Sequence, residues 1–280
     1  MQTLHQQAEQ LGILYEIIVI DDDSESRFKH QNSSILCLRH VSYTELDENI
    51  GRAAIRNLLA EQAKNPYLLF MDCDAEVADT DFLTRYLRYC TGEQVVCYGG
   101  RLYSHVLQHP TWYLRWLYGV KRECPTAAIR AQHPNRSFIT FNFLISKSIF
   151  SRLQFDTDLV GYGHEDTLFG YALTQHQITV QHLDNPLIHI GLEDSYSFIK
   201  KTENGVKNLL FLYKKTAYNK KLVEDIKLLR YFVFLERFYL KKLVKFTFYA
   251  LKTYLLRHLH GKNPKLVYFD IYKLGFMCSI

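Results

Sequence analysis

Two short apolar runs, each ending in carboxylates, dominate the hydrophobic pattern of the first 75 residues. Residues 15–20 (YEIIVI) run into three aspartates at 21–23, and residues 67–71 (YLLFM) run into Asp72 and Asp74. Short, mainly apolar runs of this kind predict strands buried on both faces. Because residues i and i+2 of an extended chain point to the same side, Asp72 and Asp74 can share one cation. An Asp-rich turn is the alternative that the spacing alone leaves open.

A helix is predicted between these two strands. Residues 51–64 (GRAAIRNLLAEQAK) carry apolar side chains at helical spacing, and Asn65 with the following proline ends the helix. Arg52 and Arg56 are four residues apart and share one face. The order strand, helix, strand predicts a parallel α/β unit with a right-handed crossover. Both acidic clusters then lie at the same edge of the sheet, where such sheets bind ligands.

The same periodicities predict further elements. Helices are expected over residues 3–11 and 81–89, and strands over residues 94–98 and 138–145. The stretch 101–136 is irregular and aromatic. Its pattern fits a substrate loop and a packed helical core equally well.

Polar candidates also occur in two later stretches. Residues 161–173 (GYGHEDTLFGYAL) place two glycines before a predicted helix that begins near Glu165 or Asp166, where the helix dipole favours a carboxylate. An ordinary acidic helix start is therefore one reading of these carboxylates. His189 ends the run 187–190, and it is either a packed side chain or a ligand.

Composition places the chain among ordinary globular proteins. It has 280 residues, 48% of them hydrophobic and 22% charged, with 20 Tyr and 18 Phe. The six cysteines are scattered without a C-x-x-C pair, which argues against a zinc ribbon or a disulfide framework and favours a reduced, cytosolic setting. The amino terminus lacks the pattern of a signal peptide, and no apolar run approaches the length of a membrane span.

The net charge of +5 is unevenly distributed. Residues 195–280 hold 18 Lys and Arg against 5 Asp and Glu, a net charge of +13, so the preceding part has a net charge of −8. An acidic body and a basic tail suggest two different roles.

The tail contains a predicted basic amphipathic helix over residues 231–256. Arg237, Lys241, Lys245 and Lys252 fall on one stripe at 100° per residue. This helix either rests on an anionic membrane, where each basic residue contributes roughly 1 kcal/mol, or packs on the body with its lysine stems along apolar surface.

We expect the membrane contact, through residues 206–256. The aromatic side chains lie apart from the lysines, which is unsuited to base stacking, so we expect no nucleic-acid partner.

Six segments in order resemble the glycosyltransferases of family 2, which have the GT-A fold. The resemblance covers about residues 15–193 and stops before the basic tail. The matching segments are IIVIDDDS (17–24), NIGRAAIRN (49–57), YLLFMDCD (67–74), FITFNFLISK (138–147), GYGHEDT (161–167) and NPLIHIG (185–191).

This resemblance implies an α/β fold with a Rossmann-like, mostly parallel central sheet and flanking helices. Residues 1–100 would form the nucleotide-sugar-binding half, residues 101–194 the acceptor-binding and catalytic half, and residues 195–280 a basic helical region.

The resemblance also implies a donor site. Asp22 matches the aspartate that contacts the base or ribose of the nucleotide, and Arg56 matches an arginine near the nucleotide. Asp72 and Asp74 match the D-x-D motif that holds Mn²⁺ or Mg²⁺ on the pyrophosphate, and His189 matches a histidine that completes the metal shell. A pyrophosphate beside a carboxylate meets repulsion of roughly 4 kcal/mol at 4 Å, which a divalent cation offsets. Oxygen ligands suit Mg²⁺ or Mn²⁺, and one imidazole favours Mn²⁺.

For catalysis, the resemblance makes Asp166 the base that accepts the proton of the acceptor hydroxyl and Glu165 a residue that contacts the acceptor. We expect an inverting, metal-dependent glycosyltransferase of the hexosyl or N-acetylhexosaminyl type. A nucleotide-sugar donor, with a UDP-sugar favoured, and a glycan or lipid-linked acceptor would be its substrates. Its role would be in surface polysaccharide synthesis. It would work in the cytoplasm, on the inner face of the cell membrane.

The chain departs from the family pattern at its start. The family normally opens with a strand and an aromatic-Asn turn of the kind V-I-I-P-x-Y-N, and this strand is missing here. Its absence leaves part of the base pocket unbuilt and exposes a sheet edge. We expect a truncated or misplaced start in preference to a natural deletion. The alternative function is a catalytically impaired GT-A remnant or a sugar-nucleotide binding module.

Overall fold

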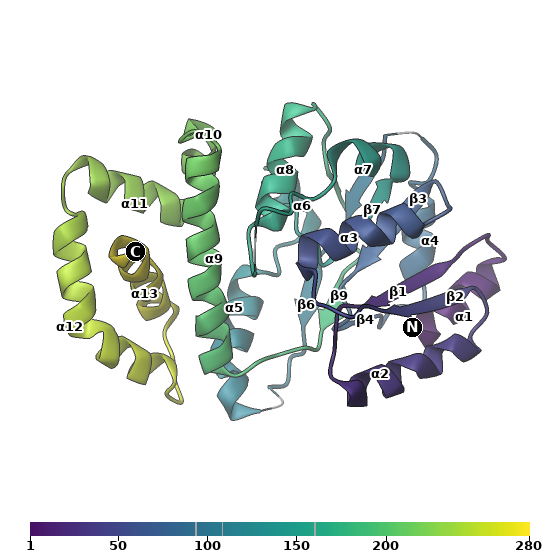
Figure 1. The fold of residues 1–280 in the computed structure, drawn as a ribbon, viewed down its shortest axis with the longest axis horizontal. Helices are drawn as coiled ribbons and strands as arrows, with labels where there is room; N and C mark the ends of the chain where they lie inside the picture. Colours follow the sequence, from purple (N-terminus) through teal and green to yellow (C-terminus); the bar gives the residue numbers. More distant parts are fainter. Residues whose placement is uncertain (93, 108, 160) are drawn as a thin grey trace. The chain divides into compact units, whose positions relative to one another are not determined.

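A computed structural model describes all residues of the chain except 93, 108 and 160, and it consists of two compact units (Figure 1). The first unit comprises Met1–Arg101, Pro125–Asp158 and Glu165–His189. The second unit comprises Leu102–Cys124, Leu159–His164 and Ile190–Ile280.

The first unit contains most of the predicted strands and helices. Its sequence order is α1 (Gln2–Leu11), β1 (Ile17–Asp21), α2 (Ser26–Asn32), η1 (Ser33–Cys37), β2 (Val41–Glu45), α3 (Gly51–Gln62), β3 (Tyr67–Met71), β4 (Ala75–Glu76), α4 (Phe82–Leu87), β5 (Val96–Tyr98), α6 (Ala127–Ala131), β7 (Asn142–Ser146), α7 (Lys147–Leu153), α8 (Glu165–Gln175), β8 (Gln181–His182) and β9 (Leu187–His189). The predicted strand at residues 67–71 is confirmed with its bounds unchanged, and β6 (Arg101–Tyr103) spans the boundary between the units.

The sheet of the first unit has one reversed strand. In the order β3-β7-β5-β8, β7 is antiparallel to β3 and β5, while β8 is parallel to β5. Three of these four strands therefore run in the same direction, in agreement with the predicted GT-A sheet.

β1 and β2 form a separate parallel pair. The search for apolar runs missed β2, because its sequence VSYTE has only two apolar residues and lies within a polar segment.

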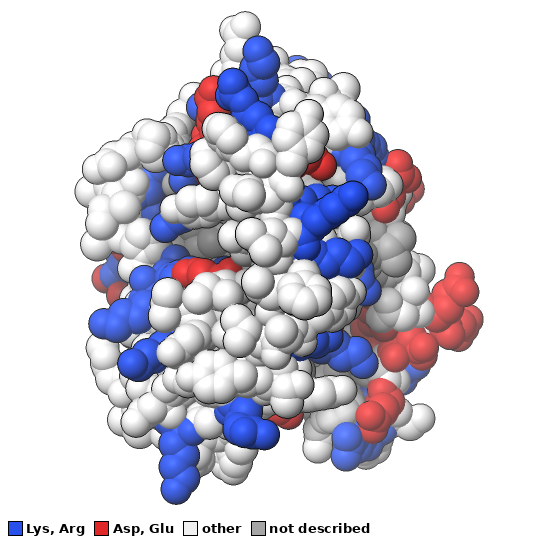
Figure 2. Space-filling view, turned by 90° about the vertical axis from the view of Figure 1, so that its left-hand side faces the viewer, with Lys and Arg blue, Asp and Glu red and all other residues white. Residues whose placement is uncertain are grey.

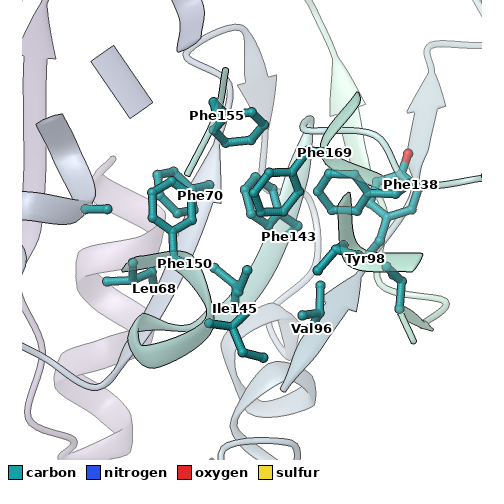
Figure 3. Packing of buried hydrophobic residues seen from close by; sticks show 14 of the residues in the cluster. Leu68, Phe70, Val96, Tyr98, Phe138, Phe143, Ile145, Phe150, Phe155 and Phe169 are labelled. Carbon is teal, nitrogen blue, oxygen red and sulfur yellow. The ribbon is translucent and has the colours of Figure 1, made fainter. Parts of the chain in front are cut away.

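Aromatic side chains fill the space between the sheet and the helices α3, α7 and α8. Because side chains alternate across a strand, Phe70 and Phe143 point to this side of the sheet, and Leu69 and Leu144 point to the side of α4. The ring centroids of Phe70 and Phe143 are 4.8 Å apart. Figure 3 shows these two rings within a larger group of phenylalanines from β3, β7, α7 and α8. This packing holds the end of β3, and with it Asp72, in a fixed position.

The second unit is helical. Its elements are η2 (Pro110–Trp112), α5 (Tyr113–Arg122), α9 (Ser195–Lys215), α10 (Lys220–Asp225), α11 (Lys227–Arg237), α12 (Lys241–Leu259) and α13 (Leu266–Ser279). Among the described residues, none of the helices is both long and apolar enough to cross a membrane.

The aromatic stretch 101–136 forms helices in both units, and Gln108 within it lies outside the described residues. Leu114 and Arg115 of α5 are buried. The Arg115 guanidinium lies 3.1 Å from the carboxylate of Glu123 and donates to the hydroxyl of Tyr103. This part of the stretch is therefore packed helical core.

The prediction of one continuous helix over residues 231–256 is wrong. Helix α11 ends at Arg237, and Tyr239 adopts a left-handed backbone with φ of 59°. The amide of Leu240 then donates to the carbonyl of Leu235, and that of Tyr239 to the carbonyl of Glu236, which is the hydrogen-bond pattern of a helix C-terminus. A glycine usually occupies this position, and a tyrosine here gives no stop signal in the sequence.

Candidate active site

A buried arginine joins two acidic segments of the first unit. Arg56 of α3 is only 7% exposed, and its Nη2 lies 2.9 Å from Oδ1 of Asp72, directly after β3. Its Nη1 lies 3.5 Å from Oε1 of Glu165 at the start of α8. Arg52, one helical turn earlier on the same face, reaches the same Glu165 oxygen at 3.7 Å. The helix predicted between the two acid clusters therefore fixes the end of β3 against the start of α8.

Asp74 and His189 form a second pair. The antiparallel pairing of β4 with β9 places Ala75 opposite His189, and the Nε2 of His189 lies 3.1 Å from Oδ2 of Asp74. The imidazole is 8% exposed and packs on the ring of Phe141, with 5.5 Å between ring centroids. Burial opposes ionisation of Asp74, but His189 and the charges of nearby arginines outweigh it and hold the pKa of this carboxyl below its usual range.

The donors of this pair suit a hard divalent cation. Oδ1 of Asp74 is buried and accepts no hydrogen bond among the described residues, so one oxygen aimed into the protein is available as a ligand. The Asp74 carboxylate and the His189 imidazole therefore fit Mn²⁺, as the sequence predicts.

Asp72, the third predicted ligand, is engaged by Arg56. Across residues 1–92, 94–107, 109–159 and 161–280, no three His, Cys, Asp or Glu side chains converge as a metal cluster. Two of the three predicted ligands are thus brought together by the fold.

Asp166 has the environment of a proton acceptor. It lies half-buried in the first turn of α8, and its Oδ1 accepts a hydrogen bond of 2.7 Å from the amide of Thr167. Burial, together with the charge of Glu165, raises the pKa of this carboxyl to about 6. Such a carboxylate is ionised at neutral pH and still basic enough to accept a proton.

Asp22 is held by the start of α3. Its two carboxylate oxygens accept hydrogen bonds from the amides of Ile50, at 2.7 Å, and Gly51, at 3.0 Å. The neighbouring Asp21 is buried and accepts hydrogen bonds from Ser24, Asn32 and Tyr43. Asp21 therefore builds the turn after β1, while the predicted nucleotide contact of Asp22 stays a prediction.

Arg101 is a candidate that the sequence reasoning missed. Its guanidinium carbon lies 4.2 Å from the ring centroid of Phe141. Its charge helps to lower the pKa of Asp74 and partly opposes the rise in the pKa of Asp166. A cation within electrostatic reach of both carboxylates is suited to bind a phosphate group. The available signal was its position directly after Gly99-Gly100, at the end of a predicted strand.

The sheet with its one reversed strand, and the acidic site at the end of β3, match the GT-A fold. Residues 2–154, more than half of the chain, match the family model described as "Glycosyl transferase family 2", and the chain belongs to this family.

Two solved structures are similar to this chain at low sequence identity. The crystal structure of TarS from S. aureus superposes with a TM-score of 0.50 and 14% identity, over 75% of this chain and 36% of TarS. The mannosyltransferase PcManGT from Pyrobaculum calidifontis, solved with GDP-Man and Mn²⁺, has a TM-score of 0.48 and 16% identity, over 71% of this chain and 55% of that one.

In sequence, the chain is 30% identical over 66 residues to a teichoic acid poly(glycerol phosphate) polymerase of Staphylococcus epidermidis, which is 23% of this chain and 9% of the relative. The chain therefore spans less than two thirds of the length of each of these three relatives.

Proposed function

We propose that this glycosyltransferase moves a hexosyl or N-acetylhexosaminyl group from a nucleotide-sugar, with a UDP-sugar favoured, to a hydroxyl of a glycan or lipid-linked acceptor, with inversion. Its role would be in surface polysaccharide synthesis. The local similarity to a teichoic acid polymerase supports a surface polymer as the product.

The observation that carries the proposal is the double ion pair of Arg56, which joins Asp72 of the D-x-D segment to Glu165, the neighbour of Asp166. It brings Asp72, which we assign to the donor side, close to Glu165, the neighbour of the proposed base. In the reaction, the acceptor oxygen bonds to the anomeric carbon as the bond from that carbon to the nucleoside diphosphate breaks. The diphosphate leaves with the electron pair, and Asp166 accepts the hydroxyl proton.

Asp74 and His189 would hold Mn²⁺ or Mg²⁺, with Asp72 close by in the D-x-D motif. The cation, when bound, would neutralise charge on the leaving diphosphate. Arg101 would contribute a fixed positive charge to the same group. Asp22 would orient the nucleoside, and Glu165, held by Arg52 and Arg56, would contact the acceptor.

A donor screen tests this function. The purified chain is incubated with UDP-, GDP- and dTDP-sugars and Mn²⁺, and release of nucleoside diphosphate is measured. We expect turnover with one donor class, loss of at least about a hundredfold in Asp166→Asn, and a comparable loss in Asp74→Asn. Asp81→Asn, which changes an exposed aspartate at the start of α4, is the matched control. Turnover that is unchanged in Asp166→Asn contradicts the assigned role.

One observation favours the alternative of a binding module without turnover. β1 and β2 form a sheet separate from β3-β7-β5-β8, so the nucleotide-binding half is not one continuous sheet. Calorimetry separates the two functions. Heat of binding for a nucleotide-sugar without product formation supports the module, and the absence of heat with every donor in the presence of Mn²⁺ contradicts both functions.

We also propose that the enzyme works in the cytoplasm, at the inner face of the cell membrane. A lipid-linked acceptor would be presented there.

A further inference from the structure

Helix α12 and the turn before it expose an unusual amount of apolar surface. Phe246 is 73% exposed and Tyr239 is 92% exposed. Around them lie other large apolar side chains that are at least 40% exposed, namely Phe238, Leu240, Leu243, Tyr249, Leu251 and Tyr254. We call the turn 238–240 and the exposed side of α12 the outer face. A contiguous apolar surface on a soluble unit marks a site of interaction.

The lysine stripe predicted from the sequence lies on the other side of α12. Phe248, Leu255 and Leu259 are the buried residues of this helix, and the ring of Phe248 packs on Tyr272 of α13. Lys245 is next to this packed side, and its Nζ donates a hydrogen bond of 2.9 Å to the carbonyl of Ser279. The lysine stems therefore follow the packed side, and the outer face is aromatic and aliphatic.

The turn before α12 also exposes a bulky side chain. Tyr239 adopts the left-handed backbone conformation, which is unfavourable for a bulky residue, and its ring is almost fully exposed to water. Burial of this ring in a partner would remove its apolar surface from water.

The charge around the outer face identifies the chemistry of that partner. Residues 227–259 contain eight Lys and Arg and one acidic residue, Glu236, which gives a net charge of +7. Figure 2, which views the second unit from the side of α12, shows uncharged surface with Lys and Arg around it and few carboxylates. Two such faces repel each other, whereas an anionic surface attracts them.

We propose that the outer face docks on a lipid bilayer that contains anionic lipids. Phe238, Leu243 and Phe246 enter the boundary between headgroups and acyl chains, as the apolar side of an interfacial helix does. The tyrosines lie at headgroup level, where a ring with a polar tip is favoured. Arg237, Lys242 and Arg257 then contact lipid phosphates.

This inference deepens the membrane location proposed above by naming the surface that makes the contact, and it does not depend on catalysis. The binding assay needs neither a sugar donor nor turnover. If the donor screen fails, the proposed membrane contact is therefore not contradicted. If the flotation assay fails, catalysis with soluble acceptors is not contradicted.

Flotation with vesicles tests the surface. The full chain is mixed with vesicles of equal parts phosphatidylcholine and phosphatidylglycerol, or of phosphatidylcholine alone. We expect the chain to float with the anionic vesicles and much less with the neutral ones, and we expect high salt to weaken the binding. The double variant Tyr239→Ser with Phe246→Ser should bind at least about tenfold more weakly. Leu14→Ser, which removes an 87% exposed leucine of the first unit, should bind like the unchanged chain.

Charge is tested in the same assay. Lys242→Glu should weaken binding to the anionic vesicles about fivefold or more, while Lys64→Glu, an exposed lysine of the first unit, should not. Thermal melts confirm that each variant is folded. Three outcomes overturn the proposal: no flotation with anionic vesicles, flotation unchanged in the double variant, or a dimer without vesicles that the double variant converts to a monomer. The last result would assign the outer face to a second copy of the chain.

Discussion

Replacing Asp166 by asparagine should stabilise the fold while it removes transfer activity. Burial and Glu165 raise the pKa of Asp166 from 3.8 to about 6. The folded state therefore binds this proton more tightly than the unfolded state does. The stability that results is fully present below about pH 4 and is lost as the pH rises through 6.

The magnitude follows from the pKa. With a pKa of about 6 in place of 3.8, the ionised Asp166 lowers the free energy of unfolding at neutral pH by roughly 3 kcal/mol. Asp166 is only half-buried, and Arg56 and Arg101 partly offset its charge. We therefore expect Asp166→Asn to raise the free energy of unfolding at neutral pH by about 2 kcal/mol. For a chain of this length, that raises the melting temperature by about 5 °C.

Thermal melts of both proteins at pH 7.5 and pH 4 check this expectation. The variant should have the higher melting temperature at pH 7.5, and the two melting temperatures should be nearly equal at pH 4. In the unchanged enzyme, kcat/KM at saturating metal should fall below about pH 6 as the base becomes protonated. A variant that melts below the unchanged chain at pH 7.5, or activity that persists to pH 4, would refute the reasoning.

Four other substitutions probe the site and its support. Arg56→Ala leaves two carboxylates without their buried partner and should lower the free energy of unfolding by about 3 kcal/mol, measured by urea denaturation. Asp74→Asn and His189→Ala should each weaken Mn²⁺ binding about tenfold or more, measured by calorimetry, and unchanged affinity would exclude them as ligands. Gly99→Ala places a methyl group 2.2 Å from Oδ1 of Asn142, so it should cost about 2 kcal/mol or more in the same urea assay.

Several elements of the first unit could be predicted because each short apolar run fits a strand better than a helix. Residues 67–71 form a strand with no charge and a polar stop at Asp72, and β3 has those bounds. The helix from Gly51 carried Arg52 and Arg56 on one face, and both reach Glu165. These features depend on the spacing of apolar residues within one segment, which can be read from the sequence alone.

Other features depend on contacts that no local pattern contains. Arg56 was expected near the nucleotide, but its partners Asp72 and Glu165 are 16 and 109 positions away, and only the fold brings them together. Helix α12 has apolar residues on more than one side, so the sequence could not tell which side faces α13. The left-handed Tyr239 divides the predicted helix because tertiary packing overrides local preference.

The separation of β1 and β3 has a consequence for how the protein behaves in concentrated solution. In the described part of the chain, each of these strands bonds to another strand on one side only, β1 to β2 and β3 to β7. Oε1 of Glu16 accepts hydrogen bonds from the amides of Lys64 and Asn65, which ties the start of β1 to the residues before β3. Open strand edges pair with other chains, so concentrated solutions should aggregate through them.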